Sequence, residues 1–174
     1  SLYDYENNYR TESYLARVRY NYKEKYNLEA SFRRDGSSRF HKDNRWGNFG
    51  SIGANWMISE EEFMKDIAWI NSLKLRANWG IVGNDAGSGY YGYMGLYTSS
   101  QNANQGAYYL SQNESYDLKW EGSEAFGFGA EARLFNRWNL SVEYFDKRNK
   151  DLLFNVYLPL SAGATANSSA TASV

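Results

Sequence analysis

Four tyrosines in a glycine-rich stretch are the residues of this chain best suited to hold a ligand. Tyr90, Tyr91, Tyr93 and Tyr97 lie in the sequence GSGYYGYMGLY. A tyrosine ring has apolar faces and a polar tip, so it can stack on a sugar ring and also form a hydrogen bond. The alternative is that these rings pack the loop on itself or on a partner protein. Because loops often carry binding residues, we take these four as candidate substrate-binding residues.

The same stretch contains the letters GSGYYG, which match the G-x-G-x-x-G pattern of dinucleotide-binding loops. That motif requires a helix directly after it, within a strand–helix–strand unit. The following residues, YMGLYTSSQNANQG, do not have the pattern of a helix. We therefore interpret residues 83–115 as a long, irregular and functional loop, and not as a nucleotide site.

The motif RRDGSSR at residues 33–39 offers a second possible chemistry. Arg33, Arg34 and Arg39 could donate hydrogen bonds to an anion beside a glycine turn. Alternatively, Asp35 and Ser37 cap their own turn and the motif is structural. The turn chemistry already accounts for these residue types, and it favours the structural interpretation.

Composition argues against several classes of function. The 174 residues include 19 Lys and Arg, 20 Asp and Glu, one histidine and no cysteine. The balanced charge gives no reason to expect nucleic acid, and thiolate chemistry and sites with several imidazoles are excluded. Asp43, Asn44 and Asp85 lack EF-hand spacing, and no pair of carboxylates stands out for catalysis. We expect no enzyme activity, no metal site and no cofactor.

The elements that position these residues are predicted to be strands, because apolar and polar residues alternate along much of the chain. The predicted strands cover residues 13–22, 26–34, 46–58, 73–82, 118–134, 138–147 and 152–158. A short helix is predicted near residues 60–66, where Ser59 and Glu62 fit a capping box. The last residues, 161–174, are small and polar and look like a loop.

The connections between these strands alternate between short and long, which places tight turns at one end of the sheet and long loops at the other. Tyr and Trp also gather near the strand ends. Both features are typical of outer-membrane barrels. One strand face would carry Tyr26, Leu28, Ala30 and Phe32 toward lipid. The residues predicted to face a polar lumen are Arg17, Arg19, Glu29, Arg33, Lys74 and Arg76. A solvated face of a soluble sheet is the alternative.

Long motifs of this chain resemble the SusC/RagA family of TonB-dependent outer-membrane transporters. They are YNYKEKYNLEASFRRDGSSRFHKDNRWGNFGSIGANWMISEEEFMK, INSLKLRANWGIVGN and LKWEGSEAFGFGAEARLFNRWNLSVEYFDKRNKDLLF. The resemblance covers nearly the whole chain after about residue 10. The segment at residues 33–40 is its most specific part.

The resemblance implies an all-β fold: antiparallel up-and-down strands of a large plugged barrel in the bacterial outer membrane, with one short periplasmic helix. It also implies import of oligosaccharides, or of peptides, with a SusD-like lipoprotein and energy from TonB. We expect residues 1–174 to be one segment of the barrel domain, about seven strands, without the plug. A soluble all-β carbohydrate-binding module is the alternative.

Overall fold

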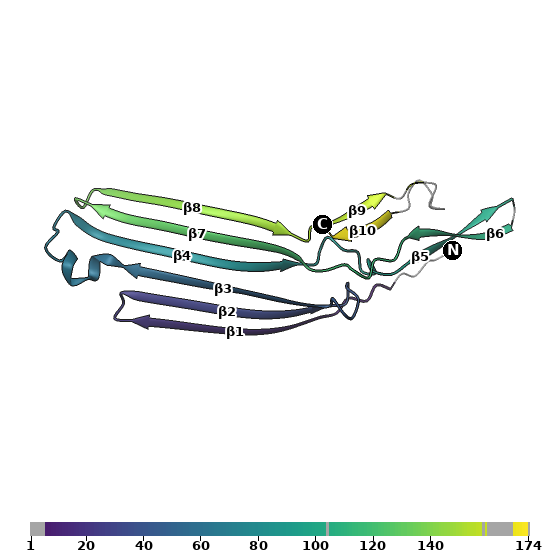
Figure 1. Ribbon diagram of the computed structural model, residues 1–174, viewed down its shortest axis with the longest axis horizontal. Helices are drawn as coiled ribbons and strands as arrows, with labels where there is room; N and C mark the ends of the chain where they lie inside the picture. Colours follow the sequence, from purple (N-terminus) through teal and green to yellow (C-terminus); the bar gives the residue numbers. More distant parts are fainter. Residues whose placement is uncertain (1–5, 104, 158, 160–168, 174) are drawn as a thin grey trace.

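Six long antiparallel strands form the main sheet of the computed structural model, which describes residues 6–103, 105–157, 159 and 169–173. Their spatial order is β1-β2-β3-β4-β7-β8 (Figure 1). These strands are β1 (Thr11–Tyr22), β2 (Tyr26–Ser37), β3 (Trp46–Met57), β4 (Ile70–Asn84), β7 (Glu121–Leu134) and β8 (Trp138–Lys150). The predicted antiparallel all-β fold is confirmed. Within the described residues the sheet does not close, because β1 and β8 stand at its two edges.

A second, smaller sheet lies beyond one end of the long strands (Figure 1). It contains β5 (Leu96–Asn102), β6 (Gln105–Gln112), β10 (Ser169–Ser173) and β9 (Leu153–Tyr157), in that spatial order. β5 and β6 form an antiparallel hairpin, and β10 joins β6 by a single parallel pair.

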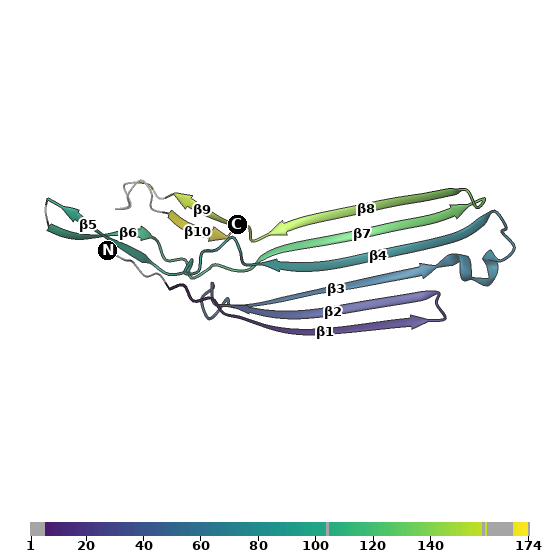
Figure 2. The same cartoon turned by 180° about the vertical axis from the view of Figure 1, so that it is seen from behind.

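The two tight turns and the connection that contains the short helices lie at one end of the main sheet, and the loops that follow β2 and β4 lie at the other (Figure 2). Both tight turns contain two consecutive residues with positive φ: Lys23 at 52° and Glu24 at 58°, and Phe135 at 52° and Asn136 at 53°. In each turn the N–H after this pair donates to the carbonyl before it at 3.0 Å. Such left-handed pairs match the twist of the flanking strands, so they close hairpins without splaying them.

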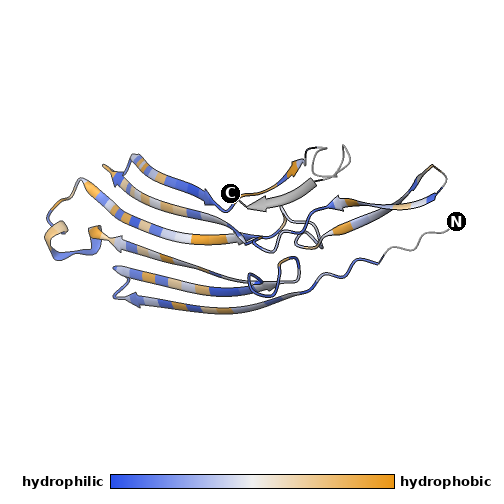
Figure 3. Ribbon diagram, turned by 45° about the vertical axis from the view of Figure 1, so that its right-hand side comes forward, coloured by the Kyte–Doolittle hydropathy of each residue, from blue (hydrophilic) through white to orange (hydrophobic). Residues whose placement is uncertain are grey.

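The two faces of the main sheet differ in chemistry, because successive side chains of a strand point to opposite sides. Hydropathy therefore alternates along the long strands (Figure 3). One row of paired residues on what we call the apolar face is Val18, Ala30, Ile52, Trp79 and Phe126, and it ends on the edge strand β8 in Asp146. The adjacent row, on the polar face, is Arg17, Ser31, Ser51, Gly80, Ala125 and Lys147.

The main sheet is a single layer with little covering either face. Among the described residues, the buried hydrophobic side chains are Phe40, Met64 and Leu118, and none lies in the six long strands. Val18 is 68% exposed and Val142 is 72% exposed. A soluble β-domain buries such residues between two packed layers. The single layer therefore argues against a soluble carbohydrate-binding module.

The structure corrects the helix that the sequence predicts near residues 60–66. The predicted helix near residues 60–66 is instead two single-turn 3₁₀ helices, η1 (Ile58–Glu60) and η2 (Glu62–Met64), with no side-chain capping bond. Glu61 separates them in an extended conformation (φ −77°, ψ 149°). Among the described residues, no helix is long and apolar enough to cross a membrane.

The loops are also more ordered than predicted. The region 83–115 was expected to be irregular, but it contains β5 and β6, and β10 falls within the predicted C-terminal loop. β2 continues through Ser37, so Asp35 and Ser37 belong to a strand and not to a turn. The predicted strand 152–158 is β9 of the small sheet, and residue 158 lies outside the described residues.

Candidate functional site

The charged residues predicted to face a lumen lie together on the polar face of the main sheet. Arg17 and Arg19 of β1 both reach Glu29 of β2, with Nε–carboxylate distances of 3.4 and 2.9 Å. Further along this face, Lys74 and Arg76 of β4 pair with Glu131 of β7 at 3.7 and 3.6 Å. Cross-strand partners share a face, so the register itself produces these pairs.

Two further contacts belong to this group. Arg76 also reaches Glu143 of β8 at 3.1 Å, which links three strands. Arg33 donates its Nε–H to Asp35 on its own strand at 2.7 Å. All six predicted residues therefore carry ion pairs along one face. These pairs are partly exposed, so each contributes little to stability, but together they give the face a dense polar surface.

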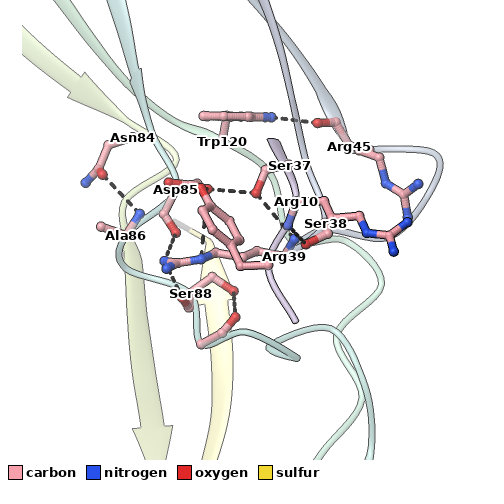
Figure 4. Close-up of polar contacts among 12 residues, drawn as sticks. Arg10, Ser37, Ser38, Arg39, Arg45, Asn84, Asp85, Ala86, Ser88 and Trp120 are labelled. Carbon is pink, nitrogen blue, oxygen red and sulfur yellow. Dashed lines mark hydrogen bonds and ion pairs between the residues drawn. The ribbon is translucent and has the colours of Figure 1, made fainter. Parts of the chain in front are cut away.

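A loop junction forms where the strands of the main sheet meet the loops (Figure 4). We use this name for the contacts of Arg39 and Asp85 with Tyr9, Ser37, Ser88 and Tyr90. The Arg39 guanidinium donates through Nη1 to the carbonyls of Asp85 and Ser88 at 3.0 and 3.1 Å. It lies over the rings of Tyr9 and Tyr90, at 4.7 and 5.0 Å from their centroids, and these two rings meet edge to face with centroids 6.1 Å apart. Arginine suits this position because it can donate hydrogen bonds in its plane and stack on rings with its faces.

Asp85 completes the junction by accepting two further hydrogen bonds. The hydroxyls of Tyr9 and Ser37 both donate to its Oδ2 at 2.7 Å. Burial, and then the hydrogen bond to the Asp85 carboxylate, raises the pKa of the Tyr9 phenol above its ordinary value. The junction thus ties together the segment before β1, the end of β2 and the chain after β4.

An aromatic cluster stands beside the junction. Trp120 packs its ring against Phe40 and Phe49, with centroid distances of 5.4 and 5.3 Å, and its Nε1–H donates to the Arg45 carbonyl at 2.9 Å. Phe40 is completely buried, and an added Cβ at Gly83 would overlap the Phe49 ring. Glycine is therefore required where β4 passes under this ring.

The polar face is hollowed beside these rings. The hollow has a volume of about 470 Å³ and is lined in part by Phe49, Trp120, Arg33, Asp35 and Ser13. It combines aromatic faces with charged donors and acceptors. That combination suits a polar organic ligand passing along the sheet, since apolar walls with a few placed polar groups are typical of binding sites.

The four candidate tyrosines do not converge on one point. Tyr90 belongs to the loop junction, and Tyr93 packs edge-on against His41 with centroids 5.9 Å apart. The Tyr91 hydroxyl accepts a hydrogen bond from the Asn8 N–H at 3.4 Å. Tyr97 lies on β5 and is 71% exposed. Three of the rings thus take part in contacts within the chain, and Tyr97 is the most accessible.

Sequence reasoning missed the partnership of Arg39 with Asp85. Arg39 belongs to the RRDGSSR motif and Asp85 to the predicted loop 83–115, but 46 positions separate them and no local pattern links such distant residues. The structural interpretation of RRDGSSR holds in a different form. The Ser37 Oγ does accept the Arg39 N–H at 3.3 Å, but Asp35 pairs with Arg33 and the Ser37 hydroxyl donates to Asp85.

Among the described residues, no group of three or more acidic or histidine side chains could hold a metal ion.

Comparison with known proteins gives a consistent result. A family model described as TonB dependent receptor-like, beta-barrel matches residues 2–173. TonB-dependent receptor P39 of Formosa agariphila is 43% identical over 159 residues, which are 87% of this chain and 15% of that protein. TonB-dependent receptor SusC of Bacteroides thetaiotaomicron is 34% identical over 162 residues, covering 88% of this chain and 16% of that protein.

Solved structures agree with the sequence relatives. A chain in the structure of the RagAB peptide transporter superposes with a TM-score of 0.80 at 28% identity, covering 94% of this chain and 18% of that one. The RagAB peptide importer in its open-open state gives the same TM-score over 95% of this chain. The present chain therefore spans 15–16% of the length of the curated relatives given above.

Proposed function

This chain belongs to the TonB dependent receptor-like β-barrel family, and on that premise we propose that it forms part of the barrel wall of a SusC-like transporter. Its parent protein would import oligosaccharides across the bacterial outer membrane. The family consists of outer-membrane receptors and transporters and not of enzymes. The observation that carries the proposal is the two-faced single sheet, with tight turns at one end and long loops at the other.

The two faces fit two different solvents. The apolar face presents Val18, Leu28 and Val142 without any covering layer, as a strand facing acyl chains would. Stacked aromatic pairs flank it: Tyr26 with Trp56 near the short turns and Tyr14 with Trp46 near the loops. Paired rings at both ends match the girdles that barrels place at the two membrane interfaces. The short turns would then be periplasmic and the loop junction extracellular.

The polar face would line the lumen. Its ion pairs between β1 and β2, and between β4, β7 and β8, give a charged wall that stays hydrated. In the parent protein this wall would face the plug through which TonB delivers energy. A SusD-like lipoprotein would cover the extracellular mouth formed by the loops. The plug, TonB and the lipoprotein are proposed from the family and not from contacts in this chain.

Substrate would meet the extracellular loops before it reaches the lumen. Of the four candidate tyrosines, Tyr97 offers the most accessible ring for stacking on a sugar. Tyr90, Tyr91 and Tyr93 would shape the surface around it, since their side chains already contact other residues. The hollow beside Phe49 and Trp120 would be the next aromatic surface along the path inward.

Uptake by intact cells tests this function. Deleting the gene of the full-length receptor should abolish uptake of a fluorescent oligosaccharide that wild-type cells accumulate, and a protonophore should do the same because TonB-linked transport requires energy. Deleting the gene of the proposed SusD-like lipoprotein should reduce uptake strongly. Unchanged oligosaccharide uptake in the receptor deletion would contradict the proposal.

Peptides are the second candidate substrate, because structures of a RagAB peptide importer superpose on this chain. The same deletion strain separates the two candidates when it is given fluorescent oligosaccharides and fluorescent peptides in parallel. Loss of peptide uptake alone would assign the receptor to peptides. Loss of oligosaccharide uptake alone would support the first candidate.

A further inference from the structure

Arg34 is a cation on the apolar face of the main sheet, near its loop end. Its strand partners are Tyr14 and Asn48, and it follows Phe32 on the same face. The side chain is exposed and makes no ion pair or side-chain hydrogen bond with a described residue. A charge that points away from the lumen without a partner is unfavourable unless its surroundings supply one.

Two other cations on the same face and at the same end are paired. Arg148 of β8 bonds Asp146 at 2.8 Å, and Lys150 bonds Glu124 at 2.7 Å. Register places both beside the end of β7, opposite Glu124 and Gly122. Among the described residues, the outward cations on β8 are thus neutralised by ion pairs, whereas Arg34 forms none.

The environment of Arg34 is organised to hold its guanidinium at the surface. The Trp46 ring lies under it, 5.1 Å from the guanidinium carbon, and Tyr14 stacks on Trp46 with centroids 6.1 Å apart. Gly36 leaves room for this arrangement, since an added Cβ would stand 3.0 Å from the Trp46 ring. Glu12 lies on the same face one pair further along and accepts the Tyr14 hydroxyl, but its carboxylate forms no ion pair with Arg34 in the described residues. The cation is therefore positioned by aromatic stacking while its N–H donors remain free.

We propose that Arg34, seated on Trp46 and Tyr14, binds the phosphate of a phosphorylated lipid headgroup in the outer leaflet. This inference rests on the proposed function, which places the loop end at the outer surface. Arginine binds phosphate through two parallel N–H donors, and a basic residue at a membrane surface attracts anionic headgroups. The stacked rings occupy the interfacial layer in which such headgroups lie.

Lipid binding to the purified full-length receptor tests the site. Native mass spectrometry in detergent would count bound diphosphorylated lipid A and its dephosphorylated form. We expect the wild-type receptor to prefer the phosphorylated form, and Arg34→Gln to lower its affinity about fivefold, as loss of one surface cation should. Arg148→Gln is the matched control, since Arg148 lies on the same face and at the same end of the sheet but is already paired with Asp146. The affinity of this variant for the phosphorylated lipid should change by less than about twofold.

Several outcomes would overturn the inference. These are equal binding by wild type and Arg34→Gln, an equal loss in Arg148→Gln, or no preference of the wild type for phosphorylated lipid. The last comparison needs no variant, so it holds even if Arg34→Gln fails to fold. If wild type binds inorganic phosphate as tightly as it binds the phosphorylated lipid, and Arg34→Gln weakens both equally, the site takes free phosphate and the lipid proposal is wrong.

Outer-membrane location and substrate uptake are measured on the same strains. Arg34→Gln should keep both, because Arg34 lies on the face of the sheet opposite the polar face. If the wild-type receptor is absent from the outer membrane or transports nothing, the proposed function fails, whatever the lipid preference in detergent. If location and uptake are normal but Arg34 has no effect on lipid binding, only the present inference fails.

Discussion

At the residue scale, Arg39 has the largest structural role among the arginines of the RRDGSSR motif. Its side chain is only 17% exposed, and it satisfies two loop carbonyls that lie 46 and 49 positions further along the chain. Arg33, in contrast, is more than half exposed and pairs with its neighbour Asp35. The difference between the two follows from burial, because a hydrogen bond lost in a buried place leaves unsatisfied groups behind.

Replacing Arg39 should loosen the loop junction. Arg39→Lys removes the planar guanidinium that lies over the Tyr9 and Tyr90 rings and donates to two loop carbonyls. We expect it to cost about 1–3 kcal/mol of local stability. Hydrogen exchange of residues 85–95 in the full-length receptor should become faster. Arg148→Lys is the control, because that arginine is 72% exposed, and it should leave exchange unchanged. Equal effects of the two substitutions would contradict the assigned role of Arg39.

The loop junction should also weaken at alkaline pH. Burial and the Asp85 carboxylate raise the pKa of Tyr9, so the folded state favours the neutral phenol. The stability that the neutral Tyr9 phenol gives to the folded junction is fully present below the ordinary tyrosine pKa. It is lost as pH rises through the raised pKa of Tyr9 in the folded state. Hydrogen exchange at residues 85–95 should accelerate over that alkaline range in the wild type, relative to Tyr9→Phe. A parallel pH dependence in both proteins would rule out Tyr9 as the titrating group.

At the element scale, the strands were predictable because apolar and polar residues alternate along them with a period of two. Tyr26, Leu28, Ala30 and Phe32 do share a face, as predicted. The β5–β6 hairpin was missed because residues 96–112 are mostly polar on both sides and carry no alternation. The helix near residues 60–66 was predicted from the capping-box residues Ser59 and Glu62, but contacts with distant residues determine the conformation of that segment.

Those tertiary contacts converge on Glu61. Its carboxylate accepts hydrogen bonds from Tyr26 and from the Trp56 Nε1–H, and it pairs with Lys25 at 3.3 Å. The side chain is thereby drawn toward the β1–β2 turn, and its backbone stays extended between the two 3₁₀ turns. Local propensity could not reveal this, since the partners lie up to 36 positions away.

Glu61 should make this end of the sheet sensitive to acid. The hydrogen bonds from Tyr26 and then Trp56 hold the pKa of the Glu61 carboxyl below its ordinary value. Its stabilising contribution is present above that ordinary value and is lost as pH falls through the lowered one. Glu61→Gln should therefore be less stable than wild type at pH 7, with the difference shrinking in acid. Denaturant unfolding in lipid vesicles at several pH values measures the difference in unfolding free energy between the two proteins. A difference independent of pH would contradict the assignment of this pH dependence to Glu61.

The two tight turns should respond differently to glycine. Glu24 has a φ of 58°, which strains a residue with a long side chain, whereas asparagine tolerates the φ of 53° found at Asn136. Glu24→Gly should raise the unfolding free energy by about 0.5–1 kcal/mol. Asn136→Gly, the matched control, should change it by less than about 0.5 kcal/mol. The reverse order in denaturant unfolding would show that turn strain is not the deciding factor.

At the scale of the whole molecule, the asymmetry of connections and the contrast between faces were both visible in the sequence, because they depend only on spacing. What the sequence could not give is the arrangement of the loop end. There, the segment before β1, the β2–β3 connection and the β4–β5 connection meet around Arg39 and Asp85. A small second sheet also extends beyond the long strands. Such contacts depend on the path of the chain and not on local pattern.

Charges on the two faces should have very different effects in the full-length receptor. Ala77 lies on the apolar face between Ala54 and Phe128, and Asn78 lies on the polar face between two glycines. Ala77→Lys should lower stability by about 2–4 kcal/mol and reduce the folded receptor in the outer membrane. Asn78→Lys should cost less than about 0.5 kcal/mol. Similar effects of both substitutions would contradict the lipid-facing assignment.

The most direct test of the central claim is cysteine labelling along β2. The chain contains no cysteine, so single cysteines can be placed at Leu28, Glu29, Ala30 and Ser31 of the full-length receptor in native membranes, after removal of any cysteine elsewhere in it. A wall strand predicts that a lipid-soluble reagent labels positions 28 and 30, and that a small water-soluble maleimide reaches positions 29 and 31. Labelling of all four positions by the water-soluble reagent would contradict the account.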